Sequence, residues 1–139
     1  MSFQRGGLTN IGEFELATVP LSIANDTLTD VVFNQITDPL NMLANNGDAF
    51  LTIPLIGPLL VTVTCDWASG AVGYRLLTDN GSIVLGRQYT TMSPTVAIAW
   101  TQTLTYARPF SPPETYRVRV RHTQGAALNL DSCILRFAV

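Results

Sequence analysis

Few residues of this 139-residue chain combine the types and the spacing that catalysis requires. His122 is the only histidine, it falls at the end of a β-strand pattern on the apolar side, and no G-x-S-x-G motif accompanies it. Cys65 and Cys133 lie far apart in sequence, which fits neither a CxxC metal pair nor a disulfide framework. We therefore expect a structural histidine, two buried thiols and no catalytic residue, and we predict that the protein is not an enzyme.

The acidic residues do not form a contiguous metal-binding motif. Asp26, Asp30 and Asp38 occupy turn and loop positions, with Asp79 and Asp131 elsewhere, and no spacing reproduces the D-x-[DN]-x-[DN] calcium loop. Loops that are distant in sequence can still converge on calcium, so that alternative stays open. We expect no cofactor and no metal.

Three arginines, Arg117, Arg119 and Arg121, share one side of a predicted strand. They could form a stripe that binds an anion or a partner, but we favour an outer face that is salt-bridged to Asp or Glu of neighbouring strands. The net charge of −2 and the sequence pI near 5.1 provide no general positive field for nucleic acid or anionic lipid. No apolar window approaches the roughly 18 residues of a membrane span. We expect neither nucleic acid nor a membrane as a partner.

The hydropathy pattern predicts β-strands and no helix longer than one turn. Residues 59–67 alternate cleanly between apolar and polar, Asp79-Asn80-Gly81-Ser82 is a hairpin signal, and residues 95–106 form a further strand. Residues 107–114 (ARPFSPPE) contain three prolines and predict an exposed loop, while residues 37–48 predict a long crossing. The spacing predicts an all-β, antiparallel β-sandwich, a jelly roll of eight to ten strands.

Length and composition predict one domain that meets other subunits. Residues 1–12 are polar and glycine-containing and predict a flexible N-terminal arm, which leaves residues 13–139 as a single jelly-roll domain. The chain is 47% apolar but only 13% charged, so much apolar surface is expected at subunit contacts. Aromatic residues predicted to be in the core or at subunit contacts include Tyr106, and the trimer-interface candidates are Trp67, Tyr74, Trp100 and Tyr116.

Four segments, in order, carry a family resemblance: FLTIPLIGPLLVTVTCDWA, GYRLLTDNGSIV, YRVRVRHTQGAALNL and ILRFAV. Together they resemble the trimeric jelly roll of the tumour-necrosis-factor and complement globular-head families and of many bacteriophage virion proteins. Pro54 and Gly57 match the P-x-x-G turn of the family, and Gly125-Ala126-Ala127 matches its small-residue turn. Pro58-Leu59 replaces the aromatic that usually follows that glycine, which favours the virion branch.

The resemblance implies a capsid decoration (cement) protein that sits as a homotrimer on the outer capsid surface, binds the major capsid protein and stabilises the shell. The alternatives are a receptor- or glycan-binding head of a phage fibre or spike, and a host-encoded collectin-like module. Assembly is expected in the host cytoplasm, because the sequence begins without an apolar signal core. The resemblance also implies that the strands of Cys65 and Cys133 are neighbours. The capsid-contact candidates in the arm are Phe3, Arg5 and Leu8.

Overall fold

The computed structural model describes residues 9–68, 74–90 and 100–139, and these residues form strands and no helix. They therefore include no helix that could cross a membrane. The described ranges contain eleven strands, one more than the upper end of the expected eight to ten. The difference comes from very short strands, since β2 and β3 have only three and two residues. In order they are β1 Asn10–Leu16, β2 Leu21–Ile23, β3 Thr29–Asp30, β4 Phe33–Thr37, β5 Phe50–Ile53, β6 Gly57–Trp67, β7 Tyr74–Asp79, β8 Val84–Thr90, β9 Trp100–Phe110, β10 Glu114–Arg121 and β11 Leu128–Ala138.

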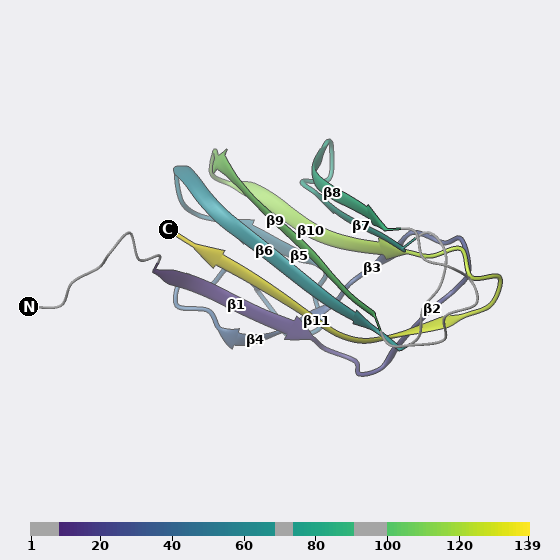
Figure 1. Ribbon diagram of the computed structural model, residues 1–139. Helices are drawn as coiled ribbons and strands as arrows, with labels where there is room; N and C mark the ends of the chain where they lie inside the picture. The colour runs from purple at the N-terminus through teal and green to yellow at the C-terminus, as the bar shows by residue number, and fades with distance from the viewer. Residues whose placement is uncertain (1–8, 69–73, 91–99) are drawn as a thin grey trace, which may run out of the picture.

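The strands form two antiparallel sheets that pack face to face (Figure 1). Sheet A has the order β4-β1-β11-β6-β9, with β2 also pairing with β11. Sheet B has the order β3-β10-β7-β8, with β5 also pairing with β10. Neighbours in each sheet are mostly distant in sequence, so the chain crosses repeatedly between the two layers. This confirms the predicted antiparallel β-sandwich of the jelly-roll type.

Period-two alternation places one side of each long strand in a shared core. In β6 the inward residues run from Leu59 to Trp67 at every second position, and each is at most 2% exposed. Tyr116 and the valines of β10 meet them from sheet B, and the Tyr116 and Phe137 rings lie edge to face with centroids 5.2 Å apart. Removing each large apolar side chain from water contributes about 1.5–3 kcal/mol to folding.

The predicted hairpin after β7 is present and is held by its own side chains. Asp79 Oδ1 accepts a hydrogen bond from the Gly81 amide at 2.8 Å, and Asn80 Oδ1 accepts bonds from the amides of Ser82 and Ile83, each at 2.9 Å. Gly81 has a φ of 91°, in the left-handed region that favours glycine. The turn residues therefore fix the reversal from β7 into β8.

The prediction of an exposed loop over residues 107–114 is wrong for most of its length. β9 continues to Phe110, which is 1% exposed, and Pro109 stands opposite Pro58 in the β6–β9 register. Pro109 is tolerated because β9 is an edge strand, so its missing amide costs no ladder hydrogen bond on the open side. Pro58 is tolerated because it precedes Leu60, where the pairing of β6 with β11 begins. Only residues 111–113 remain outside strands, and the first part of the predicted strand, residues 95–99, lies outside the described residues.

A cluster of polar groups closes the turn between β9 and β10. The Glu114 carboxylate accepts hydrogen bonds from Asn80 Nδ2 at 3.0 Å and from the Ser111 amide at 3.3 Å, and it pairs with Arg108 at 3.0 Å. Burial would raise the pKa of this carboxyl, but the hydrogen bonds from Asn80 and Arg108 outweigh it and lower the pKa. The lowered pKa keeps the Glu114 carboxylate in its charged form, in which it holds the turn.

The N-terminal segment enters the fold earlier than expected. β1 begins at Asn10, inside the predicted arm of residues 1–12, and Gly12 pairs with Phe137 of β11. Residues 1–8 lie outside the described residues.

A chain of three hydroxyls links the two sheets at their β8–β9 side. The Tyr106 hydroxyl of β9 lies 2.7 Å from both the Thr78 hydroxyl of β7 and the Tyr116 hydroxyl of β10. Tyr106 reaches them across Gly86, where an added Cβ would stand 2.7 Å from the ring. Burial raises the pKa of Tyr106 and raises that of Tyr116 well above its usual value of 10.0.

We predict that Tyr106→Phe lowers the free energy of unfolding by about 1–3 kcal/mol, because it leaves the Thr78 and Tyr116 hydroxyls without their shared partner. A phenol whose pKa is raised by folding holds its proton more tightly in the folded chain. The contribution of this phenol to the free energy of unfolding is complete below about pH 10 and is lost as pH rises through the folded pKa. Urea unfolding at neutral and alkaline pH should show a smaller alkaline loss for the variant. Tyr89→Phe, at a site 58% exposed, is the control, and an equal effect there would contradict the assignment.

The two cysteines are direct cross-strand neighbours, as expected. Cys65 of β6 pairs with Cys133 of β11, both are fully buried, and their sulfurs lie 3.2 Å apart as free thiols. The hydrogen bond with Cys133, together with burial, raises the pKa of the Cys65 thiol well above its usual value.

We predict that both cysteines stay reduced and unreactive in the native protein, because both side chains are fully buried and the pKa of the Cys65 thiol is raised. An alkylating reagent should leave the native chain unmodified and label both residues after denaturation, as measured by intact mass. An intact mass that matches a disulfide in freshly prepared protein would contradict this.

Candidate subunit interface

Several residues predicted to make contacts cannot be placed. Phe3, Arg5 and Leu8, the expected capsid contacts, lie outside the described residues. Tyr74 begins β7, but its side chain is also outside the description. Trp100 begins β9 and is half-buried against the core, and its Nε1 has no hydrogen-bond partner within the described part of the chain.

Two of the trimer-interface candidates are core residues. Trp67 and Tyr116 are fully buried within one chain because they share the inward parity of their strands. Neither side chain has surface left for a neighbouring subunit, which corrects the expectation from sequence. Their polar atoms also have partners in the interior. Trp67 Nε1 donates to Gln102 Oε1 at 3.3 Å, and the Tyr116 hydroxyl is hydrogen-bonded to the Tyr106 hydroxyl of the opposite sheet.

The outward side of sheet A is a broad surface of small and β-branched residues. It is formed by alternate positions of β6, β9 and β11, which point away from the core and are exposed or half-buried in the single chain. We call it the threonine face, and its members are Leu60, Thr62, Thr64, Thr101, Thr103, Thr105, Ala107, Ile134 and Ala138.

Strand register brings these residues into rows across three strands. Thr64 of β6 stands between Thr103 of β9 and Ile134 of β11. One row further along, Thr62 stands between Thr105 of β9 and Arg136 of β11. Cross-strand neighbours on one face are about 4.5–5.5 Å apart at their Cβ atoms, so the methyl groups form a continuous surface. β-Branched side chains are stiff at χ1, and ordering them in a contact therefore costs little entropy.

Two of the charged residues next to the threonine face, Asp66 and Arg136, have partners within the chain, whereas Glu15 of β1, which stands opposite Ile134, is exposed. Asp66 accepts hydrogen bonds from the hydroxyls of Thr101 at 2.6 Å and Ser132 at 2.7 Å. Arg136 pairs with Glu13 of β1, with Nε and Oε2 3.1 Å apart. The four residues at the centre of the face, Thr62, Thr64, Thr103 and Thr105, are uncharged, which suits the centre of a protein contact, where charged residues are depleted.

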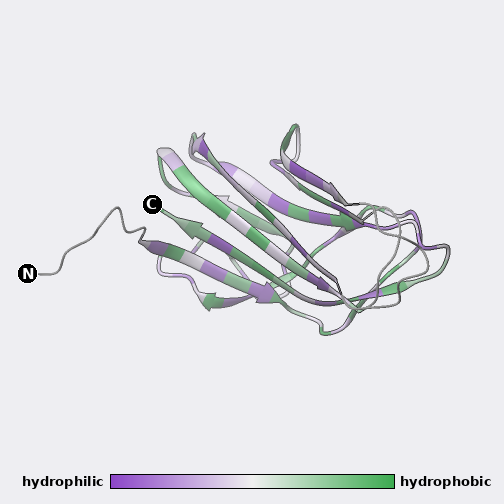
Figure 2. Cartoon of the chain, in the orientation of Figure 1, coloured by the Kyte–Doolittle hydropathy of each residue, from purple (hydrophilic) through white to green (hydrophobic). Residues whose placement is uncertain are grey.

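The outward side of sheet B has the opposite character. Purple bands recur along β10 in Figure 2, where the arginines alternate with apolar residues. Arg117 Nη2 lies 2.9 Å from Asp79 Oδ1, Arg119 Nε lies 2.9 Å from Asp30 Oδ1, and Arg121 pairs with Asp26. This confirms the favoured interpretation, in which the stripe is a salt-bridged outer face.

The remaining chemical candidates are structural in this fold. His122 is fully buried, its Nε2–H donates to the Ile23 carbonyl at 2.7 Å, and its Nδ1 accepts from the Gln124 amide at 3.2 Å. The Asp38 carboxylate accepts from the amides of Met42 and Leu43 at 2.7 and 2.9 Å. Within residues 9–68, 74–90 and 100–139, no group of three His, Cys, Asp or Glu side chains could hold a metal ion.

The threonine face was missed by the sequence reasoning, although a signal for it exists. Thr62 and Thr64 alternate with valines, and Thr101, Thr103 and Thr105 alternate with Gln102 and Leu104. Threonine is a polar residue, and a polar series on one side of a strand favours exposure to solvent over a protein contact. Only the pairing of β6 with β9 shows that the two threonine series lie side by side.

Comparison with known proteins gave matches among solved structures alone. No protein-family model matches the chain, and no curated protein matches it either. The vertex protein P5 of PRD1 superposes with a TM-score of 0.65 at 17% identity, covering 96% of this chain and 97% of that one. Murine APRIL, in a crystal structure at pH 5.0, superposes with a TM-score of 0.62 at 14% identity, covering 94% and 100% of the two chains.

The predicted resemblance to complement globular heads is also found among the solved structures. The globular domain of the zebrafish complement 1qA protein gives a TM-score of 0.58 at 9% identity, covering 92% of this chain and 96% of that one. Identities this low show the fold alone. The chain therefore has the jelly roll of the tumour-necrosis-factor and complement globular-head proteins, as the sequence segments predicted.

Proposed function

We propose that this protein is a structural component of a bacteriophage virion: a homotrimer that decorates the outer capsid surface and stabilises the shell without catalysis. The observation that carries the proposal is the match over almost the whole of both chains to a virion vertex protein, PRD1 P5. The threonine face adds independent support, because a single chain leaves this surface uncovered.

The threonine face is the proposed contact between the three copies. Its methyl groups gain from leaving water, and its hydroxyls can bond across the contact or to trapped water. A standard contact needs about 800 Å² from each partner, which the outward sides of β6, β9 and β11 are long enough to supply. Sheet B is less suited to this role because its arginines would lose solvent when buried.

The end of the sandwich that carries Thr9, the first described residue, and the C-terminus is the proposed attachment end. Thr9 and Val139 exchange two backbone hydrogen bonds, at 2.8 and 2.9 Å, and the C-terminus lies at this end in Figure 1. Ile56, which is 86% exposed, precedes β6 at the same end. Many such contacts over a shell would combine through avidity.

We predict that the purified protein has a mass of about 45 kDa in solution, three times the 15.1 kDa of one chain. Thr103→Glu should dissociate it, because three copies would bring carboxylates together at a contact that holds few charges. Thr52→Glu is the matched control, since Thr52 is an exposed strand threonine on sheet B. Light scattering measures both variants. A wild-type mass of one chain, or equal dissociation by both variants, would contradict the proposal.

We predict that deleting residues 2–8 leaves the melting temperature nearly unchanged and weakens occupancy on purified capsids across a dilution series. The deletion stops before the Thr9–Val139 hydrogen bonds, so the fold keeps its first strand. Replacing the same residues with a Gly-Ser segment of equal length is the control for chain length. Equal decoration by the shortened and intact proteins would remove the arm from the attachment mechanism.

A further inference from the structure

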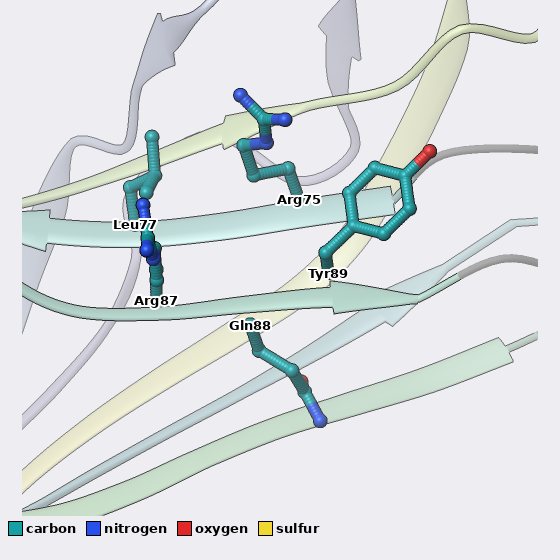
Figure 3. Close-up of a pocket in the computed structure, with 5 residues that line it drawn as sticks. All are labelled: Arg75, Leu77, Arg87, Gln88 and Tyr89. Carbon is teal, nitrogen blue, oxygen red and sulfur yellow. The ribbon is translucent and has the colours of Figure 1, made fainter.

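A pocket of about 340 Å³ lies on the outward side of β7 and β8, at the edge of sheet B. Figure 3 shows Arg75, Leu77, Arg87 and Tyr89 on one side of the two ribbons, with Gln88 pointing to the other side. The register explains this, because Arg75 stands opposite Tyr89 and Leu77 stands opposite Arg87. The pocket therefore has an apolar floor residue between two cations and an aromatic ring.

Arg75 and Arg87 differ from the other arginines that the structure describes. The other five described arginines each have a carboxylate partner within 4.0 Å, whereas these two have none within the described ranges. All acidic residues of the chain lie within those ranges, so no undescribed carboxylate of this chain can serve them. Two positive charges are left over on a chain whose net charge is −2.

The neighbouring arginines of the same sheet already have carboxylate partners. Arg121 stands beside Arg75, and Arg119 stands beside Leu77, in the β10–β7 register. Arg119 and Arg121 each form a salt bridge with an aspartate, so their charges are already paired. The pocket is thus the place on this side of the sandwich where cations are available to an anion from outside.

Tyr89 gives the pocket a second recognition element. Its side chain is 58% exposed, and the Arg75 guanidinium carbon lies 5.5 Å from the ring centroid. An exposed ring beside cationic groups presents a flat apolar surface with hydrogen-bond donors at its rim. Sugar rings use such surfaces for their C–H faces, and the planar guanidinium fork matches the two oxygens of a carboxylate or the oxygens of a sulfate.

We propose that the pocket formed by Arg75, Leu77, Arg87 and Tyr89 binds an anionic saccharide, a sugar that carries a carboxylate or a sulfate. Its volume accommodates one or two sugar rings, at the small end of ligand sites. The pocket faces away from the threonine face, so a trimer formed through sheet A leaves it open to solvent. This site does not depend on the proposed capsid role: it would give a surface protein a contact with acidic polysaccharide.

The test is titration calorimetry of the intact protein with three probes: an oligogalacturonate, a sulfated dextran oligomer and neutral dextran. We expect binding to at least one anionic probe and none to neutral dextran, and the two anionic probes distinguish carboxylate from sulfate. Arg75→Gln with Arg87→Gln should weaken that binding at least about tenfold, and Tyr89→Ala should also weaken it. Circular dichroism checks that the variants fold, since Arg87 and Tyr89 are exposed but Arg75 is half-buried.

The control variant, Ala44→Glu with Ile56→Glu, changes net charge by the same amount at exposed sites away from the pocket. It should keep affinity within about twofold. Absence of binding to both anionic probes would overturn the proposal, as would equal weakening by the control, which would indicate a general charge effect. Equal or tighter binding of a poly-glutamate peptide at the same two arginines would overturn the assignment to saccharides and indicate an acidic protein segment instead.

Discussion

The two-sided nature of a β-strand is the constraint on which this molecule depends. Each long strand gives alternate residues to a single core, and the same alternation sends the other half outwards. A shift of one residue in β6 would exchange Val63 for Thr64 at the centre of the sandwich. The core thus determines the composition of both outer surfaces, and the Tyr106 hydroxyl fixes the spacing of the sheets along the β8–β9 side.

The two outer surfaces that result have different physical uses. Sheet A presents a central group of uncharged threonines, which suits burial against identical copies. Sheet B presents arginines that are satisfied by aspartates along β10 and unsatisfied at the β7–β8 edge. One side is therefore suited to assembly and the other to solvent and to external ligands.

Much of the fold could be predicted from the sequence because its signals are local. The alternation over residues 59–67 is visible within one segment of the chain, and the Asp79–Ser82 turn is held by hydrogen bonds between residues two or three positions apart. The error at Pro109 arose because a proline excludes a central strand but not an edge strand, and edge position depends on the whole topology.

The candidate surfaces were harder to predict for the same reason. Large aromatic residues such as Trp67 suggest an interface by type, but strand parity places Trp67 in the core. Arg75 resembles Arg119 in sequence, and only the absence of a facing carboxylate among the described residues distinguishes it. Contacts between distant strands decide both cases, and single-sequence patterns carry little information about them.

The central claim is that sheet A faces a symmetry axis shared by identical copies. The most direct measurement is the distance between spin labels on different copies, placed in turn at Asn129→Cys on the outward side of β11 and Thr52→Cys on sheet B. The buried native cysteines should remain unlabelled. The account predicts a shorter distance for position 129 than for position 52. The reverse order, or no dipolar coupling at either position, would contradict it.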